Sequence, residues 1–338
     1  MSQRIRSLIL RLIVVVIALT SVSGCNESVK AQKSVKVKKD DSVNLYVDAV
    51  ILDESNKQEE AIAKLQKAVD VNPEFALAYS LLGGIYLKQN DLTKSVQAYE
   101  KATTLNQWSY EDFRDLGKVY RLMNNYTSAA GAYAKASELD PQSVDARFGA
   151  ADAYYNVQDY EKALEYGKAA RDIAPTNSEI EKLLGDIYTA MQDNELAIDS
   201  CKRVLELKGT DVSTMQNLVL CYLRTERYED AKTTLNNLIA AEPNNADTLR
   251  HFGFTCLKLR EIDQAIEKYQ KAVQLTPNDW RSHKGLGVAY MMKYRMFSSL
   301  DDPQAVEFRK KALESWSKSL DLNPTQDKLL KLYRKYAN

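Results

Sequence analysis

Proline recurs in this sequence at a regular interval, and this spacing constrains the fold more than any other feature. Pro141 and Pro175 are separated by the same interval as Pro243 and Pro277, and Pro73 precedes Pro141 by twice that interval. Proline lacks a backbone donor and clashes with the preceding helical turn, so regularly spaced prolines mark regular helix ends. The spacing therefore predicts a short helical unit that is repeated along the chain with a 34-residue period.

The other recurring residues align when the chain is divided into blocks that begin at 42, 76, 110, 144, 178, 212, 246 and 280. The third block shows the full pattern, with Phe113, Leu116, Gly117, Tyr120, Ala129, Tyr133, Ala136 and Pro141. Other blocks depart locally, since Ala151 and Val219 replace the glycine of the first helix. This pattern resembles the tetratricopeptide repeat. The resemblance implies an all-α fold, a right-handed α-α superhelix of about eight helix pairs over 42–326.

The residue types within each block fit two amphipathic helices joined by a short polar turn. Glycine and proline are both scarce, at 12 and 7 in 338 residues, which is typical of helical proteins. We expect the first-helix glycines, such as Gly83, Gly117 and Gly185, to let the paired helices approach closely. Tyrosines that recur once in each of five blocks are expected to fill the space between helices: Tyr86, Tyr120, Tyr154, Tyr188 and Tyr222. One pair cannot bury its own apolar face, so neighbouring pairs must stack.

The eighth block carries an insertion near 291–311. Tyr290 and Ala312 should be nine positions apart and are 22 apart, an insertion of 13. We expect a longer helical hairpin here, with Asp301 or Asp302 as the cap of its second helix and Pro303 as the first helical residue. A closing helix at 327–338 is expected to cover the last apolar face, as stacked repeats require.

The N-terminal residues have the order of a secretory signal, with a basic start, a short apolar middle and a small-residue exit. Three arginines and no acid precede the apolar run "LIVVVIALT", which is too short to span a bilayer as a helix. The exit "VSGC" resembles a bacterial lipobox, in which Cys25 becomes the first mature residue and carries covalent lipid, including palmitate. The alternative is a plain secretory signal with an incidental cysteine. The expected division is a signal peptide at 1–24 and a lipidated tether at 25–41.

The same resemblance implies a location in the cell envelope. Asn26 after the cysteine favours the inner leaflet of the outer membrane, facing the periplasm, over the inner membrane. The tether carries several lysines, which either attract an anionic lipid surface or simply keep a linker solvated. With 46 basic and 46 acidic residues, the chain has no charge excess that would indicate a nucleic-acid partner.

No pattern of catalytic or metal-binding residues is present in the sequence. It contains no HExxH, GxSxG, CxxC or phosphate-binding glycine loop, so we predict no enzyme activity, no metal and no cofactor beyond the lipid on Cys25. Two histidines, His251 and His283, lie in predicted first helices; His251 is a possible groove contact or a solvated or core residue. No small-molecule substrate is expected.

Three cysteines remain when Cys25 is lipidated: Cys201, Cys221 and Cys256. Their positions in the blocks predict buried thiols, because free cysteine behaves as a small apolar residue. A single disulfide among them is the alternative, since the periplasm is oxidising.

The resemblance implies that the first helices line a concave groove that binds proteins. Applied block by block, it assigns these groove residues: Arg114, Lys118, Arg121, Phe148, Tyr155, Leu220, Leu223, Arg224, Arg250, Phe254, Leu257, Lys258, Lys284 and Met291. The last three blocks would present an apolar stripe with a basic rim, which suits a peptide with acidic flanks. Alternatively, Val288, Met291 and Met292 pack against the long hairpin or the closing helix.

Three functions follow as hypotheses. The first is a membrane-anchored periplasmic scaffold that gathers envelope proteins or peptide segments. The second is a dedicated assembly lipoprotein of a pilus, secretion or exopolysaccharide-export machine. The third, an enzyme or its regulatory arm, is disfavoured by the missing catalytic residues.

Overall fold

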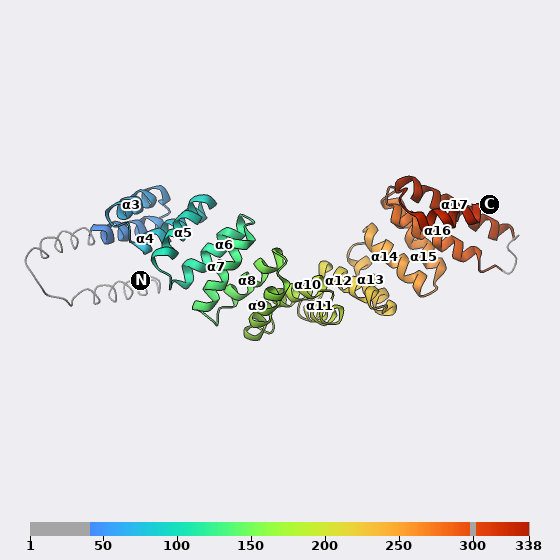
Figure 1. The fold of residues 1–338 in the computed structure, drawn as a ribbon, viewed down its shortest axis with the longest axis horizontal. Coiled ribbons are helices and arrows are strands. Elements are labelled where there is room, and N and C mark those ends of the chain that lie inside the picture. Colours follow the sequence, from blue (N-terminus) through green and yellow to red (C-terminus); the bar gives the residue numbers. More distant parts are fainter. Residues whose placement is uncertain (1–40, 298–301, 338) are drawn as a thin grey trace, which may run out of the picture. The chain divides into compact units, whose positions relative to one another are not determined.

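The computed structural model describes residues 41–297 and 302–337, and the regular structure in these ranges is entirely helical (Figure 1). This confirms the all-α prediction. Residues 41–54 are helical. The helices that follow are α3 (Gln58–Val71), α4 (Ala76–Lys88), α5 (Leu92–Leu105), α6 (Tyr110–Leu122), α7 (Tyr126–Leu139), α8 (Val144–Asn156), α9 (Tyr160–Ile173), α10 (Ser178–Ala190), α11 (Asn194–Lys208), α12 (Val212–Arg224), α13 (Tyr228–Ala241), α14 (Ala246–Lys258), α15 (Ile262–Leu275), α16 (Trp280–Tyr294), α17 (Pro303–Leu322) and α18 (Asp327–Ala337).

The helices recur with the spacing that the prolines predict. The first helices α4, α6, α8, α10, α12, α14 and α16 begin at regular intervals, each one repeat length after the previous one. Their partners α5, α7, α9, α11, α13 and α15 show the same spacing. Each pair therefore lies within one of the predicted blocks. The predicted signal peptide at 1–24, including the lipobox, and all but the last residue of the predicted tether lie outside the described residues.

Short polar segments begin and end these helices. The N-cap side chain of a first helix accepts a backbone hydrogen bond at Ser109, Ser143, Asn177, Asp211, Asn245 and Asp279, which occupy the same position in successive repeats. Between the helices of a pair, one residue takes a positive φ: Asn56, Asn90, Asn124, Gln158, Gln192, Glu226 or Arg260. A left-handed residue ends a helix and reverses the chain, so each pair folds into an antiparallel hairpin.

Close contacts within a pair join a glycine of the first helix to an aromatic ring of the second. A Cβ atom on Gly83 would lie 2.8 Å from the ring of Tyr99, and one on Gly117 would lie 2.9 Å from Tyr133. The predicted close approach at these glycines is confirmed. The rings at these glycines come from the second helices. Of the predicted tyrosine column, Tyr188 and Tyr222 are buried in the core, whereas Tyr86, Tyr120 and Tyr154 are only partly buried.

The described residues form two compact units, which are described separately. The first ends at Leu139 and the second begins at Asp140. The first unit has cores around Leu65 and Ile85 and around Tyr99 and Val119. The second unit holds further clusters, and the one that runs from α12 to α18 is the largest of those described.

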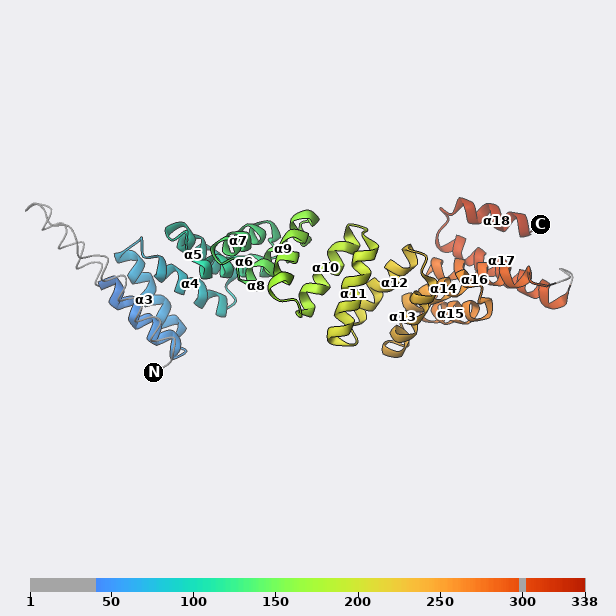
Figure 2. The same ribbon diagram turned by 90° about the horizontal axis from the view of Figure 1, so that it is seen from below.

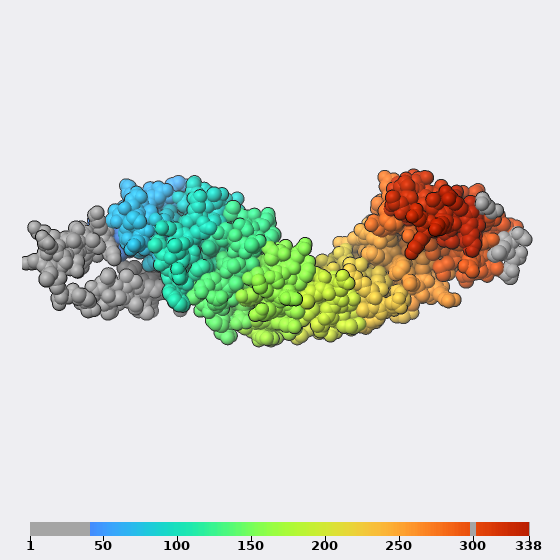
Figure 3. All heavy atoms as spheres, in the orientation of Figure 1, coloured from blue at the N-terminus to red at the C-terminus, as the bar shows by residue number. Residues whose placement is uncertain are grey.

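The C-terminal end of the second unit is a longer hairpin covered by α18. Asp302 accepts a hydrogen bond from the backbone N–H of Gln304, and Pro303 is the first residue of α17, as predicted. α18 packs beside α17 (Figure 2). Leu329 of α18 is buried. In Figure 3 the red atoms of this end form a continuous surface. The ring centroids of Trp316 and Tyr336 are 6.5 Å apart. The closing helix therefore completes a core around Trp316.

The three cysteines of the second unit are buried free thiols, as predicted. Burial raises the pKa of Cys201 and of Cys256 to about 12, so neither forms a reactive thiolate near neutral pH. None of the helices in the described part of the chain combines the length and the apolar character that crossing a bilayer requires.

Candidate binding face of the second unit

Most neighbouring first helices of the second unit pack side by side. α8 contacts α10, α10 contacts α12, and α14 contacts α16. The N-caps fix where each first helix begins, so side chains at equivalent positions repeat along one face of the helices. Most of the predicted groove residues lie on it. We call it the inner face, and Asp186, Leu220 and Phe254 mark it at the same position of successive repeats.

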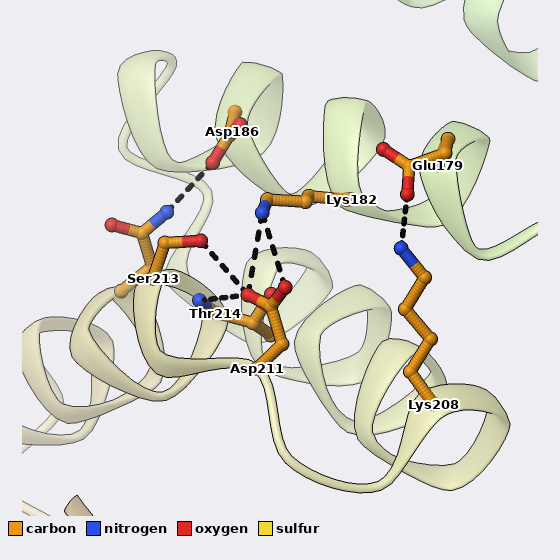
Figure 4. A network of polar contacts seen from close by, with 8 residues as sticks. Glu179, Lys182, Asp186, Lys208, Asp211, Ser213 and Thr214 are labelled. Atoms are coloured by element: carbon orange, nitrogen blue, oxygen red, sulfur yellow. Dashed lines mark hydrogen bonds and ion pairs between the residues drawn. The ribbon is translucent and has the colours of Figure 1, made fainter. Parts of the chain in front are cut away.

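A polar network connects α10 with the start of α12 on this face (Figure 4). Lys182 Nζ lies 3.2 Å from Asp211 Oδ2, and Asp211 also accepts hydrogen bonds from the Thr214 backbone and the Ser213 hydroxyl at 2.8 Å each. Although burial opposes it, these hydrogen bonds hold the pKa of Asp211 well below its usual range. Lys208 and Glu179 form a further ion pair between α11 and α10. The network fixes α12 against α10.

Asp186 is a carboxylate of this face whose burial is only partly compensated. Burial raises its pKa, and the nearby positive charge of Lys182 only partly opposes this. Asn217 Nδ2 donates to Asp186 Oδ1 at 2.6 Å. Asp186 lines an open cavity of about 310 Å³ with Tyr155, Thr189, Ala190, Gln192, Asn217 and Arg224. The cavity offers a carboxylate, a guanidinium group and neutral hydrogen-bonding groups to a polar group of a partner.

Replacing Asp186 by asparagine is expected to stabilise the second unit at pH 7. Folding raises the pKa of this carboxyl, so its charge lowers stability above the raised pKa, and this effect disappears below the unfolded value of about 3.9. The asparagine oxygen can still accept from Asn217. Thermal melts at pH 7 should therefore show a higher melting temperature for Asp186→Asn, with a difference that shrinks as the pH falls toward 4. The exposed Asp199→Asn serves as control; an equal gain there would contradict this explanation.

The structure brings several predicted groove residues together in two cavities. Tyr155 and Arg224 line the polar cavity beside Asp186. Leu220 and Arg250 line a second open cavity of about 260 Å³ between α12, α13 and α14. Both cavities open on the second unit, where the sequence predicts the apolar part of the groove.

Phe254 and Lys258 form the clearest exposed pair. Phe254 is 38% exposed, although large apolar side chains are commonly buried. Lys258 Nζ lies 5.5 Å from the centroid of the Phe254 ring and 5.4 Å from that of Tyr228. An apolar ring beside a cation fits the predicted apolar stripe with a basic rim. Lys284 is exposed on α16, with its Nζ 5.9 Å from the Trp280 ring.

Other predicted groove residues take part in the core. Met291 is only 5% exposed and packs with Trp316 and Leu329, so its assignment to the groove is wrong. Met291 belongs to the core cluster that includes residues of α17 and α18, in accordance with the alternative that the sequence leaves open. Leu223 and Leu257 are half-buried against the same cluster. Phe148 is half-buried between two other clusters of the second unit.

The remaining three predicted residues lie on α6 of the first unit. Arg114 forms an ion pair with the adjacent Asp115, with Nη2 and Oδ1 2.8 Å apart, and its guanidinium lies over the Tyr110 ring. Lys118 and Arg121 are both exposed. They form a basic edge on the first unit.

Sequence reasoning missed the fifth block. The same 34-residue register that gives Arg114, Lys118 and Arg121 in the third block gives Lys182, Asp186 and Thr189 here. That signal would have found these residues. The role of Asn217 depends on the packing of α12 against α10. In the described part of the chain, no group of three His, Cys, Asp or Glu side chains could hold a metal ion.

These observations define the class of protein: it consists of stacked helical hairpins, and its first helices together present a face with both polar and apolar side chains. Family models for the tetratricopeptide repeat match residues 76–107, 114–178 and 188–250, and a model for the TPR repeat matches 51–90 and 256–293. The chain belongs to the tetratricopeptide repeat family. Its fold is that of a scaffold for protein–protein interaction.

Known proteins are similar to the chain at low identity. A 73-residue stretch is 32% identical to FK506-binding protein 59 of Drosophila melanogaster, covering 22% of this chain and 17% of that protein. The C-terminal part of a TPR repeat-containing protein from Cytophaga hutchinsonii superposes with a TM-score of 0.57 at 15% identity, covering 75% of this chain and 98% of that one. A structure titled Naa15/Naa10 bound to HypK-THB gives 0.53 at 17% identity, over 87% of this chain and 44% of that one. The two structures show the fold alone.

Proposed function

We propose that the protein is a membrane-anchored periplasmic scaffold that binds other envelope proteins through the inner face of its second unit. The observation that carries the binding part is the exposed Phe254 beside Lys258, on the same face as two open cavities. Exposed apolar groups with a charged rim are typical of protein-binding surfaces. The lipobox-like "VSGC" supports the membrane part.

Replacing Phe254 by glutamate is expected to remove most partner capture without unfolding the protein. The side chain is partly exposed, so its loss takes little from the core, whereas a carboxylate at the centre of an apolar contact is strongly unfavourable. Crosslinking in living cells, capture of the tagged protein and mass spectrometry would compare it with the unmodified chain. Leu275→Glu, at a 44% exposed leucine of α15, is the matched control.

The identity of the crosslinked proteins decides between the two functional hypotheses. Several unrelated envelope enzymes or chaperones would support the scaffold. Components of one pilus, secretion or polysaccharide machine would instead make the protein a dedicated assembly factor. If the Phe254→Glu variant captures the same partners as the unmodified chain, the binding face does not include Phe254 and lies elsewhere.

Replacing Cys25 by alanine is expected to release the protein from membranes, because the thiol that would carry the lipid is gone. Acyl chains stabilise membrane binding by about 0.8 kcal/mol per buried methylene, so several chains anchor a protein without a spanning helix. Fractionation after a high-salt wash measures the effect, with Cys201→Ala as the control. Retention of Cys25→Ala in the membrane fraction would rule out a lipid anchor at this cysteine.

A further inference from the structure

The closing helix α18 carries a local excess of positive charge. Its 11 residues include Lys328, Lys331, Arg334 and Lys335 but a single acid, Asp327. All four basic side chains are exposed. The chain as a whole is balanced, with 46 basic and 46 acidic residues. α18 is therefore a basic surface element on a chain without net charge.

Three of the lysines share one face of α18. Lys328, Lys331 and Lys335 are three and four residues apart, a spacing that places side chains above one another on a helix. Leu332 lies beside them and is 37% exposed. We call these four side chains the lysine face. It combines a row of ammonium groups with one accessible apolar group.

The positive charges of α18 are not compensated by neighbouring acids. Within the described residues, none of its four basic side chains forms an ion pair, whereas Lys311 of α17 lies 3.4 Å from Glu307. The nearest partner of Lys335 is the ring of Tyr336, whose centroid is 5.7 Å from Nζ. The ammonium groups of the lysine face are therefore available to an anionic ligand.

Contacts with α17 fix the orientation of α18. The Nε atom of Arg309 donates to the carbonyl oxygen of Tyr336 at 2.8 Å. At the other end of α18, the buried Gln326 donates from Nε2 to the carbonyl oxygen of Asn323 at 2.9 Å. The side of α18 that carries Leu329 packs into the core, so the lysine face is presented to solvent at the edge of the second unit (Figure 2).

The chemistry of the lysine face favours an anionic lipid surface over an acidic protein segment. Arginine binds a carboxylate with two parallel hydrogen bonds, whereas lysine acts as a point charge on a flexible stem. Lysines around an exposed leucine are typical of helices that adsorb to anionic bilayers, whose headgroups attract the ammonium groups. Neither of the two open cavities of the second unit is lined by α18.

We propose that the lysine face of α18 docks on an anionic lipid bilayer. A single acyl chain binds a membrane reversibly, and a basic patch is one of the second signals that make attachment stable. α18 would add such an attachment to that of the proposed lipid on Cys25. The proposal rests on the proposed function only for the membrane in the cell, since vesicle binding is a property of this chain and can be measured without the lipid.

Vesicles are the probe, and a fluorophore on α18 is the readout. The full chain carries Cys25→Ala, so that no lipid is attached, and Ala337→Cys, which places a polarity-sensitive fluorophore at an exposed position of α18. The three other cysteines are buried and stay unlabelled. We expect the fluorescence to rise with vesicles of phosphatidylcholine and phosphatidylglycerol in equal amounts, and to rise far less with phosphatidylcholine alone. Salt at about 1 M should abolish the difference, because it shortens the Debye length to about 3 Å.

The test variant combines Lys328→Gln, Lys331→Gln and Lys335→Gln. Each lysine near an anionic surface contributes about fivefold to binding, so the vesicle titration should shift to higher lipid concentration by on the order of 100-fold. All three side chains are exposed, so the melting temperature should not change. Residues 1–40 are the same in every variant, and any binding by them is common to all.

The matched control removes the same charge elsewhere. It combines Lys101→Gln, Lys168→Gln and Lys202→Gln, at exposed lysines of α5, α9 and α11. Its titration should match that of the chain without these substitutions. Equal shifts in the two triple variants would show that only net charge matters and would overturn the lysine face.

The remaining outcomes separate the occupants and the two proposals. An equal rise with neutral and anionic vesicles would contradict docking through charge. If vesicles leave the fluorophore unchanged while the α18 variant loses an acidic protein in the crosslinking experiment, the lysine face binds that protein and the lipid proposal is wrong. Retention of the Cys25→Ala chain in membranes after a high-salt wash would count against the lipid anchor alone, because salt removes electrostatic binding by α18.

Discussion

Replacing Gly285 by valine is expected to destabilise the second unit by about 3 kcal/mol, in the range observed for overpacked cores. A side chain at this position would overlap with the ring of Tyr269, and the ring cannot move away because Gly253 on its other side is already in contact. For a unit of this size the change corresponds to a decrease of roughly 10 °C in melting temperature. Circular dichroism during heating measures it.

A double-mutant cycle tests the cause. In a Tyr269→Ala background the space is already empty, so adding Gly285→Val should cost much less than it does in the unmodified chain. Equal costs in the two backgrounds would show that the ring is not the obstacle. Gly131→Ala is the control on helix α7: nothing lies within 4 Å of its Cβ position, and alanine there should stabilise the helix by about 0.5–1 kcal/mol.

Replacing Trp316 by alanine is expected to unfold the C-terminal hairpin and α18, with a loss of about 3–5 kcal/mol. Trp316 has no exposed surface and has the largest volume of the fully buried side chains in the described residues. A Cβ atom on Gly287 would overlap with its indole, and Tyr336 of α18 lies against it. This one ring therefore connects α16, α17 and α18.

Hydrogen exchange gives the sharpest readout of this variant. Stacked repeats are stabilised mainly by their nearest neighbours, so loss of protection should be confined largely to α14–α18 and leave α3–α7 of the first unit unchanged. Val306→Ala, at a 49% exposed residue of α17, is the control. A uniform loss of protection over both units would contradict an effect transmitted from neighbour to neighbour.

The local sequence determined where the helices begin and end. The N-cap side chains Ser109, Asp211 and Asp279 act on backbone groups within three residues, so their effect can be predicted without knowledge of the fold. The same holds for Asp302 and Pro303 at the start of α17. The 34-residue register also fixed which helix faces repeat, and it contains the signal for Asp186 that block-by-block reading overlooked.

Which side chains meet depends on how the helices pack. Tyr86 lies on the same helix as Gly83, and it is Tyr99 of the partner helix α5 whose ring meets that glycine. Met291 satisfies the groove register, but two later helices bury it.

The open cavity of about 260 Å³ joins Val219, Leu235 and His251 from three different helices. Caps and turns depend on neighbours in the chain, so they can be predicted from the local sequence. Burial and cavities depend on atoms that distant segments bring to the same place, and for this protein they emerge only when the helices pack.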